Sequence, residues 1–124
     1  KAEEILKFLE LYNKKDELIA GQPYGVLKKV ELGRTLMSDP KLIILDEPAA
    51  GLNETETSQL AGLLRDIRDK YHCTILLVEH DMRLVMDVCD RICAINFGRK
   101  LGEGVPGAIQ ENKDVQEAYL GTEV

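Results

Sequence analysis

Four large apolar residues run directly into two carboxylates and a proline at residues 42–48 of this 124-residue sequence. The apolar run does not alternate with polar residues, so it predicts a strand buried on both faces, as central strands of parallel sheets are. Asp46 and Glu47 then lie at the carboxyl end of that strand, where open α/β sheets bind their ligands. A strand that ends in a solvated acidic turn explains this segment equally well, so the choice between a site and a turn depends on the rest of the sequence.

The next segment predicts a helix and a second strand. Asn53 and Glu56 have the spacing of a capping box, which satisfies the first backbone N–H groups of a helix. The helix has an apolar face at helical spacing, formed by Leu60, Leu63, Leu64 and Ile67. Residues 74–78 form another apolar run, which completes a βαβ unit. Such a unit has parallel strands and a right-handed crossover.

Polar side chains follow both predicted strands at their carboxyl ends. Asp46-Glu47 follows the first strand, and Glu79-His80-Asp81 follows the second. Because parallel strands end at the same edge of a sheet, we expect these side chains to converge. A zinc site within residues 79–81 alone is disfavoured, since consecutive residues rarely converge on one metal ion.

The rest of the chain shows helical periodicity and a third strand, with no repeats, low-complexity tract or linker. The further predicted elements are helices at 2–12, 16–21, 26–38 and 82–89, a strand at 92–97, a short strand near 100–101, and two short helices within 106–120. Residues 102–107 fit the GxGxxG pattern, but no second strand with a ribose-binding acid follows. We interpret them as a glycine-rich turn into a tail helix.

Composition and charge exclude several classes of function. The chain has the size of one domain, with 44% hydrophobic and 31% charged residues. Its net charge of −6 argues against a nucleic-acid binder that relies on phosphate contacts. No apolar run approaches the roughly 20 residues of a membrane span, and no signal peptide is evident, so any membrane role is expected to be peripheral.

Three cysteines, Cys73, Cys89 and Cys93, form an odd set without CxxC spacing. This pattern favours a reducing compartment, with the thiols buried as small hydrophobic groups.

Residues 22–25, Gln-Pro-Tyr-Gly, deliver a glycine to the start of the predicted helix at 26–38. Helix N-termini attract anions through free N–H groups and a partial positive charge. Lys28 and Lys29 lie near this end, where the macrodipole disfavours cations unless an anionic partner compensates them. Two solvated lysines explain the same residues.

Four motifs in order resemble those of an ABC-type ATPase, and more narrowly the nucleotide-binding subunits of branched-chain amino-acid importers. The resemblance rests on "QPYGVLKKVELGRTL", "DEPAAGLN", "LVEHDMRLVMDVCDRICAINFGRKLGEG" and "VQEAYLG", which together cover essentially the whole chain. It implies an α/β fold, a partial P-loop NTPase domain with parallel strands and flanking helices. In this family the strand that ends in Asp-Glu is the Walker B motif.

The resemblance also implies a role for each matching residue. Asp46 would bind Mg²⁺ at the ATP phosphates, and Glu47 would be the catalytic base for the attacking water. His80 would be the switch histidine. The signature loop would contain Pro23, Tyr24 and Gly25, and the D-loop that crosses to a partner subunit would be Ala49, Ala50, Gly51, Leu52 and Asn53.

Partners and location follow from the same resemblance. The subunit would dimerise with a second nucleotide-binding subunit, bind transmembrane permease subunits, and lie in the cytoplasm on the inner face of the cell membrane. It would bind no nucleic acid.

The chain departs from the family pattern in two motifs. The usual signature is Leu-Ser-Gly-Gly-Gln, but residues 22–26 read Gln-Pro-Tyr-Gly-Val, so the serine is missing. Importer-type relatives resemble this variant. Asn53 stands where many relatives have aspartate, and we interpret it mainly as a helix cap.

A larger departure is that nothing matches Gly-x-x-x-x-Gly-Lys-Ser/Thr, the phosphate-binding loop that the family places further upstream. We therefore interpret the chain as a carboxyl-terminal half that lacks the P-loop strand. Residues 1–38 would end the helical subdomain, 39–105 would belong to the catalytic core, and 106–124 would form a helical tail. These 124 residues alone should neither bind nor hydrolyse ATP, and their exposed strand edges should favour self-association.

Two rival functions stay open at this point. One is a soluble ABC ATPase that acts on nucleic acid or ribosomes, which the acidic balance and the short tail disfavour. The other is a non-catalytic α/β binding module of receiver or flavodoxin type, in which Glu47 would have no function.

Overall fold

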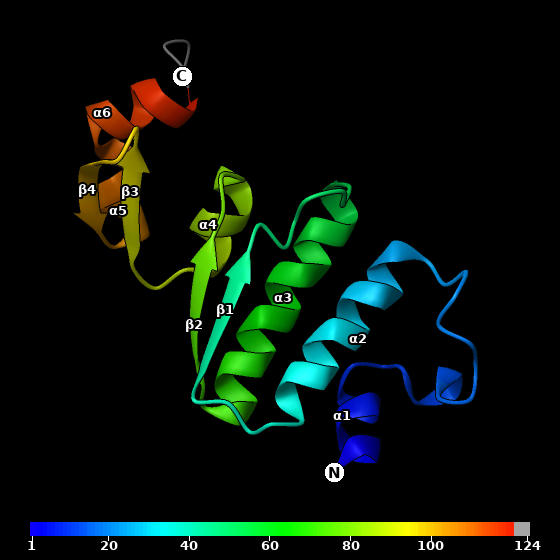
Figure 1. Cartoon of the computed structure of the whole chain (residues 1–124). Helices are drawn as coiled ribbons and strands as arrows, with labels where there is room; N and C mark the ends of the chain where they lie inside the picture. Colours follow the sequence, from blue (N-terminus) through cyan, green and yellow to red (C-terminus); the bar gives the residue numbers. More distant parts are fainter. Residues whose placement is uncertain (121–124) are drawn as a thin grey trace.

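The computed structural model describes residues 1–120 as two small sheets with helices packed beside them (Figure 1). The first sheet pairs β1 (Leu42–Asp46) with β2 (Thr74–Val78) in parallel, so that Asp46 lies opposite Val78. The second pairs β3 (Ile92–Asn96) with β4 (Arg99–Gly104) in an antiparallel hairpin. The α/β class and the parallel βαβ unit predicted from sequence are confirmed.

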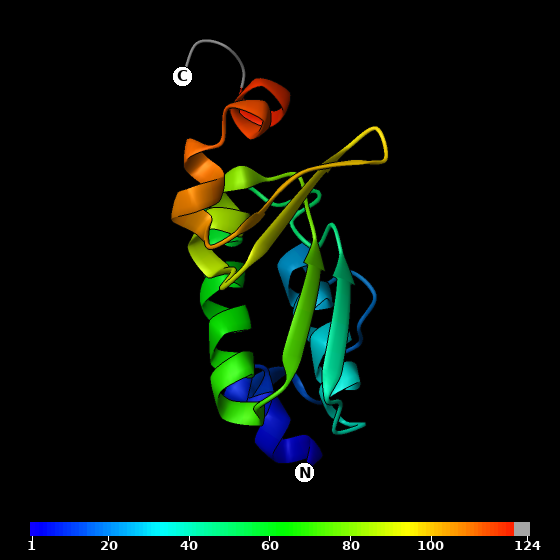
Figure 2. The ribbon, with the colours of Figure 1, turned by 90° about the vertical axis from the view of Figure 1, so that its left-hand side faces the viewer.

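Helices cover one face of the β1–β2 sheet (Figure 2). They are α1 (Ala2–Phe8), α2 (Tyr24–Leu36), α3 (Glu54–Tyr71) and α4 (Met82–Val88), with a 3₁₀ turn at Tyr12–Lys14. Their apolar faces meet β1 in a core that includes Leu9, Leu36, Ile43, Leu64 and Ile67. The predicted capping box is present at α3, where the Asn53 side chain accepts from Glu56 N at 2.8 Å.

The tail packs on the hairpin as a second, smaller cluster. It consists of α5 (Pro106–Glu111), α6 (Lys113–Val115) and a π-helical turn at Gln116–Leu120. Ile109 and Val115 are buried there against Ile92, Ala94 and Val85. A Cβ at Gly102 in β4 would lie 2.6 Å from Nδ2 of Asn112, so a larger residue there would displace the Asn112 side chain, which donates to Leu101 O. The GxGxxG segment is thus part of a strand and a tail helix.

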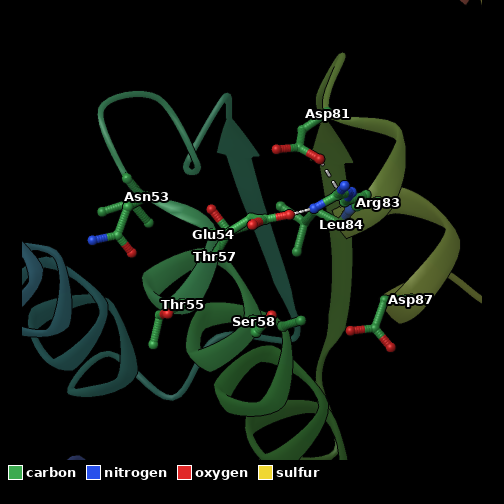
Figure 3. A pocket seen from close by; sticks show the side chains of 11 residues that line it. Asn53, Glu54, Thr55, Thr57, Ser58, Asp81, Arg83, Leu84 and Asp87 are labelled. Carbon is green, nitrogen blue, oxygen red and sulfur yellow. Dashed lines mark hydrogen bonds and ion pairs between the residues drawn. The ribbon is translucent and has the colours of Figure 1, made fainter. Parts of the chain in front are cut away.

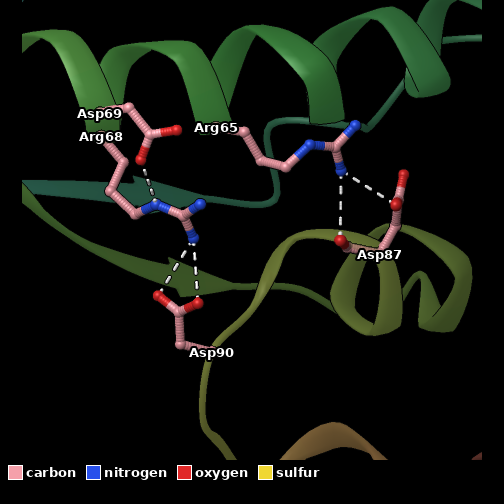
Figure 4. A network of polar contacts seen from close by, with 5 residues as sticks. All are labelled: Arg65, Arg68, Asp69, Asp87 and Asp90. Carbon is pink, nitrogen blue, oxygen red and sulfur yellow. Dashed lines mark hydrogen bonds and ion pairs between the residues drawn. The ribbon is translucent and has the colours of Figure 1, made fainter.

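Arginines of α3 hold α4 and the following turn in place (Figure 4). Arg65 Nη1 donates to Asp87 Oδ1 at 2.9 Å, and Arg68 Nη1 donates to Asp90 Oδ1 at 3.0 Å. The neighbouring carboxylates Asp69 and Asp90 raise the pKa of the Arg68 guanidinium. These pairs are partly exposed, so they orient the elements more than they stabilise them.

Two predictions near the amino terminus are wrong: one helix is shorter than predicted, and the other does not form. The helix expected over 2–12 ends at Phe8, because Glu10 adopts a positive φ of 60°. The helix expected at 16–21 does not form, and Leu18 in that segment is 83% exposed. Short helices depend on packing for their stability, and this segment buries no apolar face.

The expectation that the first strand is buried on both faces is also wrong for this chain. Ile43 is buried against the helices, but Ile44 on the opposite face is 63% exposed, and Leu76 beside it on β2 is 52% exposed. Among residues 1–120 no element covers that face. The prediction that all thiols are buried fails at Cys93, which is exposed, while Cys73 is buried and Cys89 is half-buried.

The strands β2 and β3 do not pair with each other. A hollow of about 560 Å³ separates them, lined by residues of β2, α4 and β3 that include Leu77, Val88 and Ile92. The two strands therefore belong to separate sheets.

The open apolar face predicts self-association of the 124-residue chain, because exposed strands and apolar patches pair with other copies. We expect sedimentation velocity to show dimers or larger species, and Leu76→Lys to shift the chain toward monomer. The matched control is Leu18→Lys, which changes an exposed leucine away from the sheet. A wild-type chain that stays monomeric at high concentration would contradict the prediction.

Candidate functional site

The two acidic tails meet at one edge of the β1–β2 sheet, as predicted. Glu47 N donates to Val78 O at 2.7 Å, which extends the parallel pairing one residue beyond the strands. The Glu47 and His80 side chains then contact each other, with Oε1 of Glu47 2.6 Å from Nδ1 of His80. An Nδ1–H group donates to the carboxylate in this arrangement, which leaves Nε2 free to face a ligand.

Glu47 reaches this position through an unusual backbone conformation. Its φ is +49°, in the left-handed region that favours glycine. A glutamate held there is strained, and such strain concentrates at functional sites. Both side chains remain accessible, since His80 is 73% exposed.

Three side chains in this edge have the composition of a partial metal site. Glu47, Glu79 and His80 each offer one ligand atom, and these atoms lie within 4.8 Å of one another. Glu79 differs from the other two because its side chain is only 1% exposed and its oxygens accept backbone N–H groups. The sequence prediction did not assign it a role, although its position directly before His80 marked it as part of the edge.

The predicted metal ligand Asp46 lies outside that group of three. It is exposed at the end of β1 and lines a pocket of about 180 Å³ together with Lys28 and Thr35 of α2. The structure therefore brings Glu47 and His80 together and leaves Asp46 adjacent, on the side of α2.

The predicted signature loop and D-loop touch within this chain. Gly51 has a φ of +82°, and a Cβ built on it would lie 3.2 Å from Cε1 of Tyr24. Only glycine fits both the backbone conformation and the close approach of the ring. Tyr24 also lies under Lys28, whose Nζ is 5.1 Å from the ring centroid.

The amino end of α2 offers free backbone donors. Its N-cap is Pro23, and no side chain caps it. A pocket of about 230 Å³ opens beside this end and is lined by Gly25, Lys28 and Lys29 among others. Uncapped N–H groups and two lysines suit an anionic ligand such as a phosphate, whereas the Glu56 carboxylate, which also lines the pocket, opposes one.

A larger pocket, of about 580 Å³, lies between the start of α3 and α4 (Figure 3). Asn53, Asp81 and Arg83 line it, and Arg83 forms an ion pair with Glu54 across its mouth. Glu47 and His80 do not line this pocket. Asp81 instead caps α4, accepting from Leu84 N at 3.2 Å.

Comparison with known proteins agrees with this arrangement of motifs. Residues 99–124 match the model of a family described as "Branched-chain amino acid ATP-binding cassette transporter". The chain is 47% identical over 98 residues to the high-affinity branched-chain amino acid transport ATP-binding proteins BraF of Pseudomonas aeruginosa and LivG of Escherichia coli. Each alignment covers 79% of this chain and 38% of the relative, so the chain spans less than half the length of these curated relatives.

Solved structures show the same fold. The ADP conformation of MJ1267, an ATP-binding cassette of an ABC transporter, superposes with a TM-score of 0.87 at 30% identity, over 98% of this chain and 49% of that one. The structure of cbiO1 from Clostridium perfringens, part of an ABC transporter complex, gives 0.84 at 29% identity, over 94% and 47%.

The fold and the motifs thus define part of an ATP-binding cassette. The resemblance recognised from the motifs is confirmed: the chain corresponds to the carboxyl-terminal part of ABC transporter nucleotide-binding subunits, and it resembles those of branched-chain amino-acid importers. None of the helices described within residues 1–120 has the length and apolar character of a membrane span.

The strained backbone at Glu47 predicts that glycine is more stabilising than alanine at this position, the reverse of their order inside a helix. Glu47→Gly should be more stable to urea than Glu47→Ala by about 1 kcal/mol, because alanine keeps the left-handed strain and both variants lose the carboxylate. The control site is Glu31 in the middle of α2, where Glu31→Ala should be the more stable by about 1 kcal/mol. The same order at both sites would show that Glu47 is unstrained.

Proposed function

We propose that this chain is the carboxyl-terminal part of a subunit that hydrolyses ATP to drive the uptake of a small solute, with branched-chain amino acids as the expected cargo. The observation that carries the proposal is the 2.6 Å contact between Glu47 and His80 at the shared edge of two parallel strands. The BraF and LivG resemblance supports the cargo class.

The residues present suit Mg²⁺ and ATP as far as this chain reaches. Mg²⁺ binds carboxylate oxygens, and the exposed Asp46 side chain offers two of them at the end of β1. Uncapped N–H groups at Tyr24 and Gly25 suit a phosphate. When bound, Mg²⁺ neutralises charge on the phosphates and the triphosphate supplies the bond that water cleaves.

The residues predicted from the resemblance then have defined tasks. Asp46 holds the metal ion, and Glu47 orients the attacking water and accepts its proton. His80, fixed by its Nδ1 contact to Glu47, presents Nε2 toward the water and the terminal phosphate. Pro23, Tyr24 and Gly25 close on nucleotide held by a second subunit, and residues 49–53 cross to that subunit.

The proposed partners are a second nucleotide-binding subunit and transmembrane permease subunits, with the complex on the cytoplasmic face of the cell membrane. The net charge of −6 gives no support to a nucleic-acid partner. In this proposal residues 1–38 form the last part of the helical subdomain, 39–105 belong to the catalytic core, and 106–124 form the helical tail.

The first test concerns the missing phosphate loop. Sequencing upstream of Lys1 should reveal, in the same reading frame, a Gly-x-x-x-x-Gly-Lys-Ser/Thr segment that follows a strand. The isolated 124 residues should show no ATP turnover, because the loop that cradles the phosphates is absent from them. A stop codon directly upstream of Lys1, or ATP turnover by the pure chain, would refute this part of the proposal.

The second test uses the complete subunit with its phosphate loop. Glu47→Gln should lower kcat by about 10² to 10⁴-fold, the usual loss for a general base, and trap an ATP-bound dimer. His80→Ala should lower kcat more than it weakens nucleotide binding, and Asp46→Asn should mainly impair Mg²⁺-dependent steps. Phosphate release measures kcat for each variant, and size-exclusion chromatography with ATP measures the trapped dimer.

His72→Ala is the matched control for His80, since His72 lies at the far end of α3. Turnover that survives Glu47→Gln would remove Glu47 from this role and favour a binding module.

A further inference from the structure

We propose that Glu79 is a positioning residue that fixes the D-loop backbone and the switch histidine relative to each other; this inference rests on the proposed ATPase function. Glu79 has no assigned part in the chemistry above, yet its side chain is 1% exposed while its neighbours Glu47 and His80 are open to solvent. A buried carboxylate is costly unless its oxygens are hydrogen-bonded, so its contacts reveal what it does.

Both Glu79 oxygens accept backbone N–H groups, and they do so from two different loops. Oε1 accepts from His80 N at 3.0 Å and from Asp81 N at 3.3 Å. Oε2 accepts from Ala49 N at 3.1 Å, across 30 positions in the sequence. One carboxylate therefore connects residues 79–81 to the first residue of the predicted D-loop.

The connection continues on each side of Glu79. On one side, the His80 backbone is fixed, and Nδ1 of its ring lies 2.6 Å from Glu47 Oε1 and 3.8 Å from Glu79 Oε1. On the other side, the D-loop turns tightly through Ala49 to Gly51, where the Tyr24 ring packs against the glycine. Displacement of the D-loop by a partner subunit would thus be transmitted to His80 through the Glu79 side chain, in addition to the direct contact between Glu47 and His80.

Water competes poorly for this link because the side chain is buried. Hydrogen bonds to a charged acceptor are stronger than those between neutral groups, and a buried donor that loses its acceptor is left unsatisfied. Ala49 is itself buried, so its N–H group has no ready replacement in solvent. The link should therefore hold the D-loop in one conformation rather than merely occupy space.

Glutamine is the informative substitution, because it has the shape of glutamate with one acceptor atom instead of two. Its oxygen can serve either the His80 and Asp81 pair or Ala49. The orientation that keeps two bonds places the amide NH₂ group against Ala49 N–H, donor against donor. Glu79→Gln should therefore release the D-loop while the turn at residues 80–81 stays bonded, whereas Glu79→Ala should release both.

Hydrogen exchange on the 124-residue chain tests the link itself. In Glu79→Gln the amide of Ala49 should exchange at least about tenfold faster than in the wild type, the loss expected for one charge-assisted bond, while the β1 amides stay protected. The matched control is Glu111→Gln, an exposed glutamate at the end of α5. Unchanged exchange at Ala49 would overturn the inference.

Kinetics in the complete subunit test the consequence. We expect Glu79→Gln to lower kcat about tenfold or more with KM and nucleotide affinity within about twofold, since the D-loop and His80 act on hydrolysis rather than on binding. A merely structural role would instead lower the amount of folded enzyme and leave kcat per active site unchanged, which would overturn the inference. Titration of the active sites with tightly bound nucleotide counts the folded enzyme, and so separates a lower kcat per site from a lower number of sites.

The inference and the proposed function fail in different ways. If the wild-type subunit does not hydrolyse ATP, or Glu47→Gln has no effect, the proposed function is wrong. If Glu47→Gln abolishes turnover while Glu79→Gln matches both the wild type and Glu111→Gln, only the positioning role is wrong.

Discussion

The parallel pairing of β1 with β2 is the interaction on which the rest of the structure depends. It places Asp46 opposite Val78, so the residues that follow each strand emerge at one edge. The additional bond from Glu47 N to Val78 O then fixes the first acidic turn, and with it the approach of Glu47 to His80. Without this register the acids would lie on separate surfaces, and the chain would have no candidate site.

The two faces of that sheet have different partners. Ile43 and the helices build the core, while Ile44 and Leu76 face outward with nothing described in this chain to cover them. The hollow between β2 and β3 is similarly open. Strands with continuous apolar runs are typical of sheets covered on both faces, so both features are consistent with a chain that carries part of a larger cassette. The same openness makes the isolated chain prone to associate.

Much of this arrangement could be predicted from local sequence signals. The capping residues Asn53 and Glu56 mark the start of α3, and uninterrupted apolar runs mark β1 and β2. The helices near the amino terminus are harder to predict, because Glu10 has a positive φ and residues 16–21 bury no apolar face. The hydrophobic periodicity of the sequence reveals neither property. The pattern of the strand predicts burial on both faces, but burial depends on neighbours that residues 1–120 do not supply.

The sequence by itself determined the order of elements from β1 onward, the parallel edge and the identity of the residues there, because these follow from periodicity, caps and strand direction. Only the tertiary structure decided how those residues are arranged around the edge. Asp46 lines a pocket together with residues of α2, Glu47 and His80 meet, and Glu79 is buried and accepts from Ala49 N. The reason is physical: side-chain contacts across 30 or more positions depend on strand register and on the left-handed turn at Glu47, which no local pattern of residues encodes.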